Sequence, residues 1–413
     1  MFSTINSLII LFSIFPLAII AGNLSINTSI ILISLIFLIS SIIKISLLKG
    51  QKKNFLLLGF FFTSLLINLL FSNSFYLSAP RVIKFFFIIF FIVSFRFLIL
   101  NLEKNQINKI YKIWSIIFTI IIMDLIIEFF KGTNIIGLSS QMPGWRLASF
   151  TGMESVIGNY FYGFALITLA YFYQNISNKK YLNLLLAIFF IIISLIIGER
   201  ANFVKTFIII ICFIFLVYDF SLRSKIFSIV ALISLVFIFI NFNSSYKNRY
   251  FSPHLLTILE KNGLSNYLQT SQYGAQYNVA IEIFKDNPVF GVGIKNYRIE
   301  NLDSKYDNSF NIHSILKHKS NRFRWGTHPH QIHLEILSET GLFGYSCFFI
   351  FISLSIFFSI KSYLINRNIY QLSGILFILT SMLPLLPSGS FLSTYTSSIF
   401  WINYAMMMAY IKD

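Results

Sequence analysis

The chain has 413 residues, of which 56% are hydrophobic and 11% are charged, with a mean hydropathy of +0.75. A soluble domain carries roughly 25% charged residues, and a protein this apolar could not cover a water-facing surface. The composition therefore excludes a soluble protein and predicts an all-α polytopic membrane protein. The net charge of +17 is explained by Lys and Arg that retain cytoplasmic loops, so we predict no nucleic-acid partner.

Apolar runs long enough to cross a bilayer recur along the chain. One spanning helix needs about 20 mostly apolar residues, and the sequence predicts about 12 such helices. The first begins almost at Met1 without a basic region or cleavage site, so we interpret it as a retained span rather than a signal peptide. The predicted ranges are 4–21, 26–43, 55–71, 82–100, 110–130, 155–174, 182–198, 201–218, 226–241, 342–360, 370–386 and 396–411.

The distribution of Lys and Arg orients these spans. With the N-terminus in the cytoplasm, the inside connections hold fourteen Lys or Arg residues. The short outside connections hold only Arg81, Lys131, Arg146 and Arg200, with Lys84 and Lys205 just inside the adjoining helices. This asymmetry predicts that both termini face the cytoplasm, and that the outer connections face the opposite side, which in a bacterium is the periplasm.

One outer connection, from about Phe242 to Thr340, is far longer than the others. It contains all six histidines of the chain, with eleven Lys or Arg and eight Asp or Glu residues. A loop this long inside a compact fold is usually functional or carries its own structure. We therefore divide the chain into spans 1–9 at 1–241, a periplasmic loop with short helices at 242–341, and spans 10–12 at 342–413.

Two short helices are predicted within this loop. Apolar spacing predicts the first over 272–285, and the residues that follow, 288–293, are typical of a turn. Gly291-Val292-Gly293 is not a nucleotide fingerprint, because it lacks the third glycine, the preceding strand and the acidic partner. The second helix is predicted over about 330–340 with Gly341 as its C-cap. Its two glutamates are expected to be solvated or capping charges.

Three histidines, His328, His330 and His333, lie within six positions at the start of this second helix. His330 and His333 would share one helix face, because residues three apart are neighbours. Histidine clusters bind metals, but no cysteine or carboxylate completes a recognised spacing and no His-Glu-x-x-His pattern occurs. We therefore predict no metal and no cofactor. Cys212 and Cys347 lie inside apolar runs and are expected to be packing residues.

Four motifs occur in a defined order. Arg146–Phe150 precedes the sixth predicted span, and Gly198-Glu199-Arg200 ends the seventh. Asp286–Gly293 forms the predicted turn, and His330-Gln331 is followed after nine residues by Gly-x-x-Gly. In this order, with the predicted spans and the large outer loop, the chain resembles the bacterial O-antigen ligase and O-antigen polymerase superfamily over most of its length.

The resemblance implies a glycosyltransferase. Members of the superfamily move a glycan from undecaprenyl diphosphate, a lipid carrier, to a sugar hydroxyl at the periplasmic face of the inner membrane, and the ligases are not known to need a cofactor. A ligase uses lipid A core as its glycolipid acceptor, a polymerase uses another lipid-linked repeat, and related members use protein. The ligase-type histidine pattern favours a ligase, with a polymerase as the alternative. Membrane lipid is a further expected partner.

The implied chemistry needs positively charged side chains beside the departing diphosphate. Guanidinium groups are always charged and bind phosphate oxygens in pairs, so Arg200 and Arg146 are the candidates. The alternative for Arg200 is an interfacial anchor that reaches the headgroups, and Glu199 is its partner or a solvated neighbour. Many family members also have an arginine just before the first loop helix. Here residues 271–274 contain none, and Arg249 is the nearest arginine upstream.

The implied chemistry also needs a base beside the attacking hydroxyl. Histidine suits this role near neutral pH, and His330 is the candidate because it begins the Gly-x-x-Gly pattern. The alternative is a capping or surface histidine. His328, Gln331 and His333 are expected to support the site as substrate-binding residues.

A transporter or flippase is an alternative of a different class. About 12 spans suit many transporters, and Asp124 and Glu128 lie one turn apart on one predicted helix, where carboxylates relay ions. Transporters built from repeats show corresponding halves, and the sequence shows none. It also keeps its histidines in one outer loop, which favours the transferase.

Overall fold

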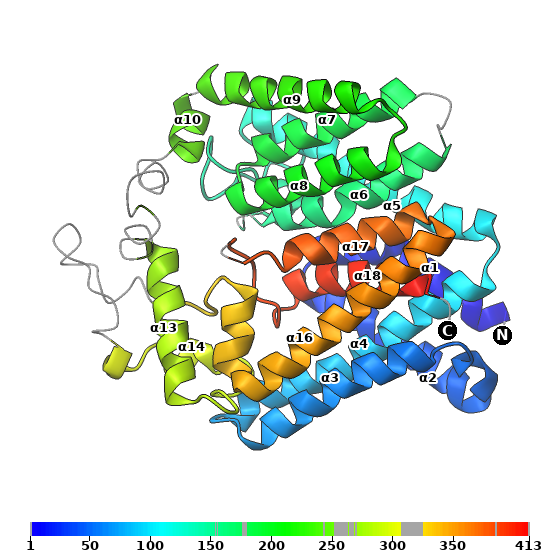
Figure 1. Ribbon diagram of the computed structural model, residues 1–413, viewed down its shortest axis with the longest axis vertical. Coiled ribbons are helices and arrows are strands. Elements are labelled where there is room, and N and C mark those ends of the chain that lie inside the picture. Colours follow the sequence, from blue (N-terminus) through cyan, green and yellow to red (C-terminus); the bar gives the residue numbers. More distant parts are fainter. Residues whose placement is uncertain are drawn as a thin grey trace.

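The computed structural model describes residues 2–152, 154, 156–175, 180–242, 244–251, 263, 268, 271–306, 325–384 and 386–411. Across these ranges the protein is helical and contains no β-strand, which confirms the predicted all-α class. The long helices lie side by side in one bundle, and both termini are at the same end of it (Figure 1).

Each predicted apolar range falls on a long helix of this bundle. Seven of the described helices, namely α2, α3, α4, α5, α8, α9 and α16, are long and apolar enough to cross a membrane. The chain is therefore a multi-pass membrane protein, while the count of twelve spans stays a prediction. The long helices are α1 (Phe2–Ile20), α2 (Asn23–Ile43), α3 (Lys52–Leu70), α4 (Phe75–Asn101), α5 (Lys104–Lys131), α6 (Ile157–Asn175), α7 (Lys180–Ile197), α8 (Arg200–Val217), α9 (Leu222–Phe242), α16 (Ile332–Asn366), α17 (Ile369–Ser381) and α18 (Tyr395–Ala409).

Local signals in the sequence start and end these helices. Glu103 and Gln106 form a capping box at the start of α5, in which each side chain binds the other residue's backbone N–H. Gly132 ends α5 with a left-handed backbone (φ 78°). At the start of α17, the Asn368 side chain accepts a hydrogen bond from the backbone N–H of Gln371 at 2.9 Å. Such caps pair backbone groups that the helix itself leaves without partners.

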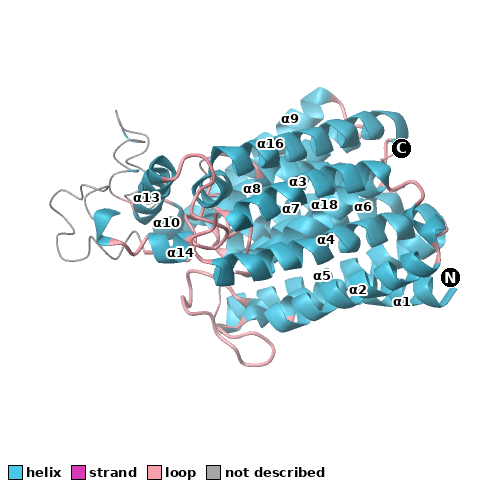
Figure 2. Cartoon of the chain, turned by 90° about the horizontal axis from the view of Figure 1, so that it is seen from below, coloured by secondary structure: helices cyan, strands magenta, loops and turns pink. Residues whose placement is uncertain are grey.

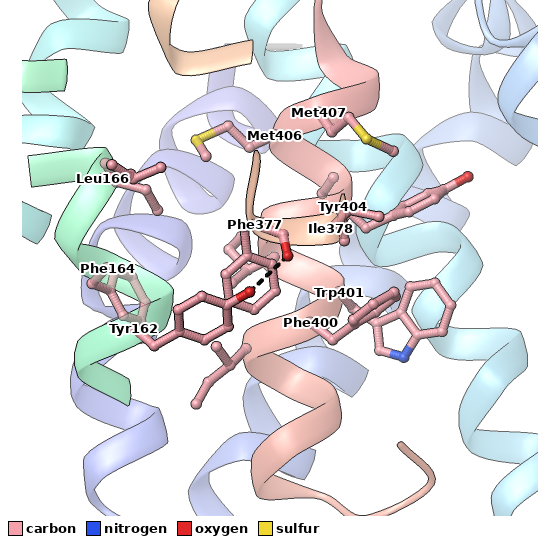
Figure 3. Close-up of a cluster of buried hydrophobic side chains, with 14 of the residues drawn as sticks. Tyr162, Phe164, Leu166, Phe377, Ile378, Phe400, Trp401, Tyr404, Met406 and Met407 are labelled. Carbon is pink, nitrogen blue, oxygen red and sulfur yellow. Dashed lines mark hydrogen bonds between the residues drawn. The ribbon is translucent and has the colours of Figure 1, made fainter. Parts of the chain in front are cut away.

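The buried centre of the bundle lies where α17 packs against α6, α8 and α18. Tyr162 of α6 stacks on Phe377 of α17 with ring centroids 4.4 Å apart, and its hydroxyl donates to the Phe377 carbonyl at 2.8 Å (Figure 3). Trp401 of α18 is also buried in this cluster. Large apolar side chains on the outside remain exposed, including Phe227 (75%) and Met123 (59%). Such an apolar exterior suits contact with lipid.

The described part of the polar segment between α9 and α16 lies at the end of the bundle opposite the termini (Figures 1 and 2). Its described elements are α10 (Ser244–Tyr250), α13 (Gln272–Asp286), α14 (Tyr297–Glu300) and the 3-10 turn η4 (Ser304–Tyr306). The helix predicted over 272–285 is thereby confirmed as α13. The Ser271 side chain caps it by accepting a hydrogen bond from the backbone N–H of Gly274 at 3.0 Å.

The eleventh predicted range was too long. We predicted a span over 370–386, whereas α17 ends at Ser381. Pro384 and Pro387 follow closely, and proline disfavours helical geometry at the residue before it. The described residues of the connection to α18 instead fold back toward the polar end of the bundle, where residues 386–389 line a cavity.

Candidate functional site

A cavity of about 520 Å³ brings together four residues that the sequence singled out. Arg146, Arg200, Arg249 and His330 all line it, although they come from four separate segments. The other walls are formed by the segment between α5 and α6, the first turns of α6, α8 and α18, Tyr273 of α13, and the connection between α17 and α18. The cavity therefore combines membrane helices with the polar outer segment.

Two buried carboxylates of α5 hold the segment that carries Arg146. Asp124 accepts a hydrogen bond from the backbone N–H of Ile135 at 2.8 Å, and Glu128 accepts one from that of Ser149 at 2.6 Å. Both carboxylates are only 2% exposed. Burying a carboxylate is costly unless it is hydrogen-bonded, and these donors meet that need. The two residues proposed above as possible ion relays thus anchor the wall of the cavity.

Arg146 forms an ion pair with Glu199, which is the N-cap residue of α8. Its Nη2 lies 3.6 Å from Glu199 Oε2. The Glu199 carboxylate also accepts hydrogen bonds from the Gly158 backbone N–H at 2.8 Å and from Asn202 Nδ2 at 2.6 Å. Burial raises the pKa of Glu199, while Arg146 and these hydrogen bonds act in the opposite direction. Glu199 is therefore a buried ion-pair partner, here of Arg146, and not a solvated neighbour of Arg200.

Arg200 is the first residue of α8 and follows a tight turn. Gly198 in that turn has a left-handed backbone (φ 78°), and a Cβ there would lie 2.1 Å from the Trp145 carbonyl oxygen. The absence of a side chain lets the α7–α8 turn pack directly on the segment that carries Arg146. The backbone N–H of Leu147 also donates to the Ile197 carbonyl at 3.0 Å across this contact.

Arg249 reaches the same turn from α10. Its Nε donates to the Gly198 carbonyl at 3.0 Å. Burial lowers the pKa of Arg249, and the positive charges of Arg200 and Arg146 lower it further. The three guanidinium groups therefore repel one another within one cavity, and an anion bound between them would relieve that repulsion.

His330 faces these arginines from a strained backbone position. Its φ is 54°, a left-handed conformation that is uncommon for a residue with a side chain. The backbone N–H of Ser388 donates to the His330 carbonyl at 2.8 Å and holds it there. The imidazole lies edge-on to Tyr273 (centroids 5.6 Å apart) and 4.0 Å from the ring of His328. Burial, followed by the charge of neighbouring His328, lowers the pKa of His330 to about 4, so it is neutral at pH 7.

The second loop helix starts later than predicted, and this separates the neighbouring residues from His330. The helix α16 begins at Ile332, and Gln331 is its N-cap, accepting a hydrogen bond from the backbone N–H of Leu334 at 2.8 Å. His330 is therefore outside the helix and does not share a face with His333. A left-handed residue cannot continue a right-handed helix, which is why the start moves past it.

Gln331 and His333 do not line the cavity. Gln331 is buried by its capping role. His333 Nε2 lies 2.9 Å from the Met382 carbonyl oxygen, and its Nδ1 lies 3.2 Å from the Tyr345 hydroxyl. His328 also lies outside the lining, but its ring packs on His330. Of these three residues, only His328 has a ring contact with His330. A direct contact of the three residues with substrate stays a prediction.

Two sequence motifs meet at a break in α16. Gly341 breaks α16 with φ 65° and ψ −170°, so the first part of α16 ends there, as predicted from the sequence. A Cβ on Gly341 would lie 2.3 Å from the Val289 carbonyl oxygen, and one on Gly291 would lie 2.5 Å from the Glu339 carbonyl carbon. The backbone N–H of Leu342 donates to the Pro288 carbonyl at 2.8 Å. The turn at 288–293 and the Gly-x-x-Gly motif therefore pack into each other. This contact fixes the position of α16, which begins just after His330 in the chain.

The two glutamates of α16 were expected to be solvated, and this was wrong. Glu335 and Glu339 are both 0% exposed. Glu335 Oε1 lies 3.8 Å from Lys295 Nζ, and its Oε2 accepts from the backbone N–H of Phe391 at 2.8 Å. Glu339 accepts from the backbone N–H of Lys295 at 2.7 Å. Their position on the helix did not indicate that the outer segment and the α17–α18 connection cover them.

The histidines do not form a metal cluster in the described part of the chain, where no group of three or more His, Cys, Asp or Glu residues is arranged to hold a metal. His254, His313 and His318 lie outside the described residues.

Some residues of the cavity were not expected from the sequence. Tyr273 was assigned only to a helix face, and residues 386–389 were assigned to the eleventh span or its end. Residues 386–389 could have been recognised as a turn from the sequence, because Pro387 and Gly389 flank Ser388. For Tyr273 no local pattern indicates that it contacts His330.

Residues 182–349 match a protein-family model described as O-antigen ligase. The matched region starts in α7 and ends in α16, so it includes Arg200, Arg249 and His330, whereas Arg146 precedes it. A comparison with curated proteins found no match.

Proposed function

Because the match over residues 182–349 supports the O-antigen ligase and O-antigen polymerase superfamily, we propose that the chain is a ligase-like glycosyltransferase of this superfamily. It moves a glycan from undecaprenyl diphosphate to a sugar hydroxyl, with lipid A core as the acceptor, at the periplasmic face of the bacterial inner membrane. The observation that carries this proposal is the cavity that Arg146, Arg200, Arg249 and His330 line together.

The three arginines fit the donor diphosphate. Arg146, Arg200 and Arg249 line one cavity, whose described lining contains no lysine, and guanidinium is the side chain best matched to phosphate oxygens. Because Arg249 reaches the cavity from α10, it fills the role of the arginine that is absent before α13. Negative charge develops on the diphosphate as it leaves, and positive groups already in place stabilise that charge.

His330 fits the acceptor. In the proposed step the acceptor hydroxyl oxygen forms a bond to the anomeric carbon of the donor glycan, and the bond from that carbon to the phosphate oxygen breaks. The bonding electron pair leaves with undecaprenyl diphosphate, and His330 takes the hydroxyl proton. The lowered pKa leaves His330 unprotonated and ready to accept, and a bound diphosphate raises its affinity for the proton as the reaction proceeds.

The two alternatives differ in their support. An O-antigen polymerase uses the same donor chemistry, so the cavity suits it equally, and only the ligase-type histidine pattern favours a ligase. A transporter is less well supported, because Asp124 and Glu128 are engaged with the backbone of the segment that carries Arg146. Carboxylates held in this way act as anchors.

The proposal is tested in proteoliposomes that contain the purified full chain, a lipid-linked glycan and a lipid A core acceptor. The His330→Ala variant is expected to lower the transfer rate at least about 100-fold, the usual contribution of a general base, and to keep its affinity for the donor. The Lys131→Gln variant, which changes an exposed lysine at the same end of the bundle, is the control and should transfer normally. Full transfer by His330→Ala would disprove the assignment.

A further inference from the structure

A second group of cations gathers outside the His330 cavity, where the outer part of α4 meets α14. Arg81 and Lys84 lie three residues apart on α4 and therefore on one face. Arg298 lies on α14, and its charge acts on Arg81, as Arg81 acts on Lys84. We call Arg81, Lys84 and Arg298 the α4 cation cluster. Asn296 fixes this arrangement, because its Nδ2 donates to the Ser78 hydroxyl of α4 at 3.1 Å.

The cluster has nitrogen atoms that are buried without partners. Lys84 Nζ and Arg298 Nε are shielded from solvent, and neither makes a hydrogen bond to a described residue. Arg81 likewise has no ion pair among the described residues. Buried polar atoms in proteins are nearly always hydrogen-bonded, and a buried charge without a partner is costly. These atoms therefore indicate an anionic group that completes the site.

The nearby carboxylates do not supply that group. Glu335 is already engaged by Lys295, Ser390 and the backbone of Phe391. Glu339 accepts through Oε2 from the Lys295 backbone, and only its Oε1 remains without a partner among the described residues. Arg81 and Lys295 interact with Glu339, and Lys295 also pairs with Glu335. The three cations of the cluster and Lys295 together outnumber these two carboxylates by two positive charges.

A small cavity of about 20 Å³ leads to the cluster and limits what can enter. Arg81 and Lys84 line it together with Ser393 and Ser397. A volume of about 10–15 Å³ holds one water molecule, so this cavity takes a single oxygen atom while the rest of the group stays at its mouth. A phosphoryl group meets this requirement, because it can insert one oxygen and leave the others to the arginines.

Neighbouring residues of one connection, that between α17 and α18, line the two cavities. Residues 386–389 line the His330 cavity, whereas residues 391–393 line the small one. Between them, Ser390 binds Lys295 Nζ at 2.6 Å and also contacts Glu335. A group held at the α4 cation cluster would therefore lie beside the same connection that lines the His330 cavity.

We propose that the α4 cation cluster binds a phosphate group of the acceptor lipid. This inference rests on the proposed function, in which the donor diphosphate occupies the three arginines of the first cavity. The second anion site is then left for the second lipid substrate. Lipid A core and a lipid-linked repeat both carry phosphate, so the assignment holds for a ligase and for a polymerase.

A binding measurement tests the site without requiring turnover. The full chain in phosphatidylcholine nanodiscs is titrated with fluorescent lipid A and with the same lipid after removal of its phosphates. The wild type should bind the phosphorylated form about tenfold more tightly, the effect of one charged hydrogen-bonded contact. Lys84→Gln and Arg298→Gln, on different helices, should each remove most of this preference, and the exposed Lys131→Gln should keep it. Both cluster variants should melt no lower than the wild type, because no partnered contact is lost.

Four outcomes would overturn the inference or separate its failure from that of the proposed function. Equal binding of the two lipid forms by the wild type, or an unchanged preference in both cluster variants, would remove the phosphate site. Loss of the preference when phosphatidylglycerol replaces part of the phosphatidylcholine would assign the site to bulk headgroups and overturn the acceptor assignment. In the transfer assay, Lys84→Gln should raise the KM for acceptor with kcat unchanged. A phosphate preference without any transfer by the wild type would support the site and contradict the proposed function.

Discussion

Arg146 and Glu199 form an ion pair that joins two segments of the cavity, with Nη2 and Oε2 3.6 Å apart. Glu199 is 8% exposed and is also bound by a backbone N–H and a side-chain amide. Arg146 consequently has two functions at once. It neutralises the buried Glu199 carboxylate, and it places its own positive charge at the cavity that is proposed to hold the donor diphosphate.

These two functions of Arg146 can be separated by a double variant. Arg146→Gln should lower the free energy of unfolding by about 2 kcal/mol, because it leaves Glu199 as a buried carboxylate without its cation. Adding Glu199→Gln should restore most of that loss, since no buried charge then remains. Transfer should stay low in both variants, because the cation for the diphosphate is absent. Denaturation in detergent and the transfer assay provide the two measurements.

Recovery of transfer in the double variant would contradict this view of Arg146. It would show that Arg146 acts only by neutralising Glu199 and has no role toward the donor.

Glu128 provides a test between an anchoring role and ion transport. In Glu128→Ala, the backbone N–H groups of Ala148 and Ser149, which now donate to the carboxylate, lose their acceptor. The loss of these hydrogen bonds should lower the free energy of unfolding by about 1–3 kcal/mol. Transfer should fall because the segment with Arg146 is less firmly held. Proton uptake by proteoliposomes, followed with a pH-sensitive dye, should be absent for the wild type and the variant. Glu128-dependent uptake would favour the transporter instead.

The helices could be predicted from the sequence because apolar runs report burial or lipid contact directly. The helix at 272–285 was also predictable, since its apolar spacing and its proline-containing end are local signals. The grouping of Arg200 with His330 came from the order of motifs and not from any property of the two residues. In the structure two of these motifs are in contact, because the turn at 288–293 and the break at Gly341 pack into each other.

Features that depend on distant segments could not be predicted. Glu335 lies one turn into α16 like a solvated capping charge, and it is buried only because Ser390 and Phe391 fold over it. The left-handed backbone of His330 likewise depends on a hydrogen bond from Ser388, which is 58 residues away along the chain. Local spacing carries no information on either contact.

The lowered pKa values of two histidines predict how stability depends on pH. Burial lowers the pKa of both His328 and His330 to about 4, from an ordinary value of 6.5. Above pH 6.5 both residues are neutral in the folded and the unfolded chain and contribute nothing to the pH dependence. Between pH 6.5 and about 4 the unfolded chain takes up protons that the folded chain does not, so stability falls as the pH falls.

This pH dependence is measured as the melting temperature of the purified protein in detergent at a series of pH values. The decline between pH 6.5 and 4 should be shallower in the His328→Gln/His330→Gln double variant than in the wild type. Parallel curves would show that other groups, chiefly carboxylates, cause the decline.

Gly341 should tolerate no side chain. Its backbone is left-handed (φ 65°), and a Cβ would lie 2.3 Å from the Val289 carbonyl oxygen. Gly341→Ala therefore combines backbone strain with a clash against the turn, and we expect it to lower the free energy of unfolding by about 3 kcal/mol or more. Because α16 begins just after His330 in the chain, a shift of α16 would also displace His330, and transfer should fall as well. Gly59→Ala is the matched control, since a Cβ at Gly59 in α3 meets nothing within 4 Å. Alanine favours a helix over glycine, so this control should be as stable as the wild type or slightly more stable. A Gly341→Ala variant that melts with the control would show that the turn and the break in α16 are not interlocked.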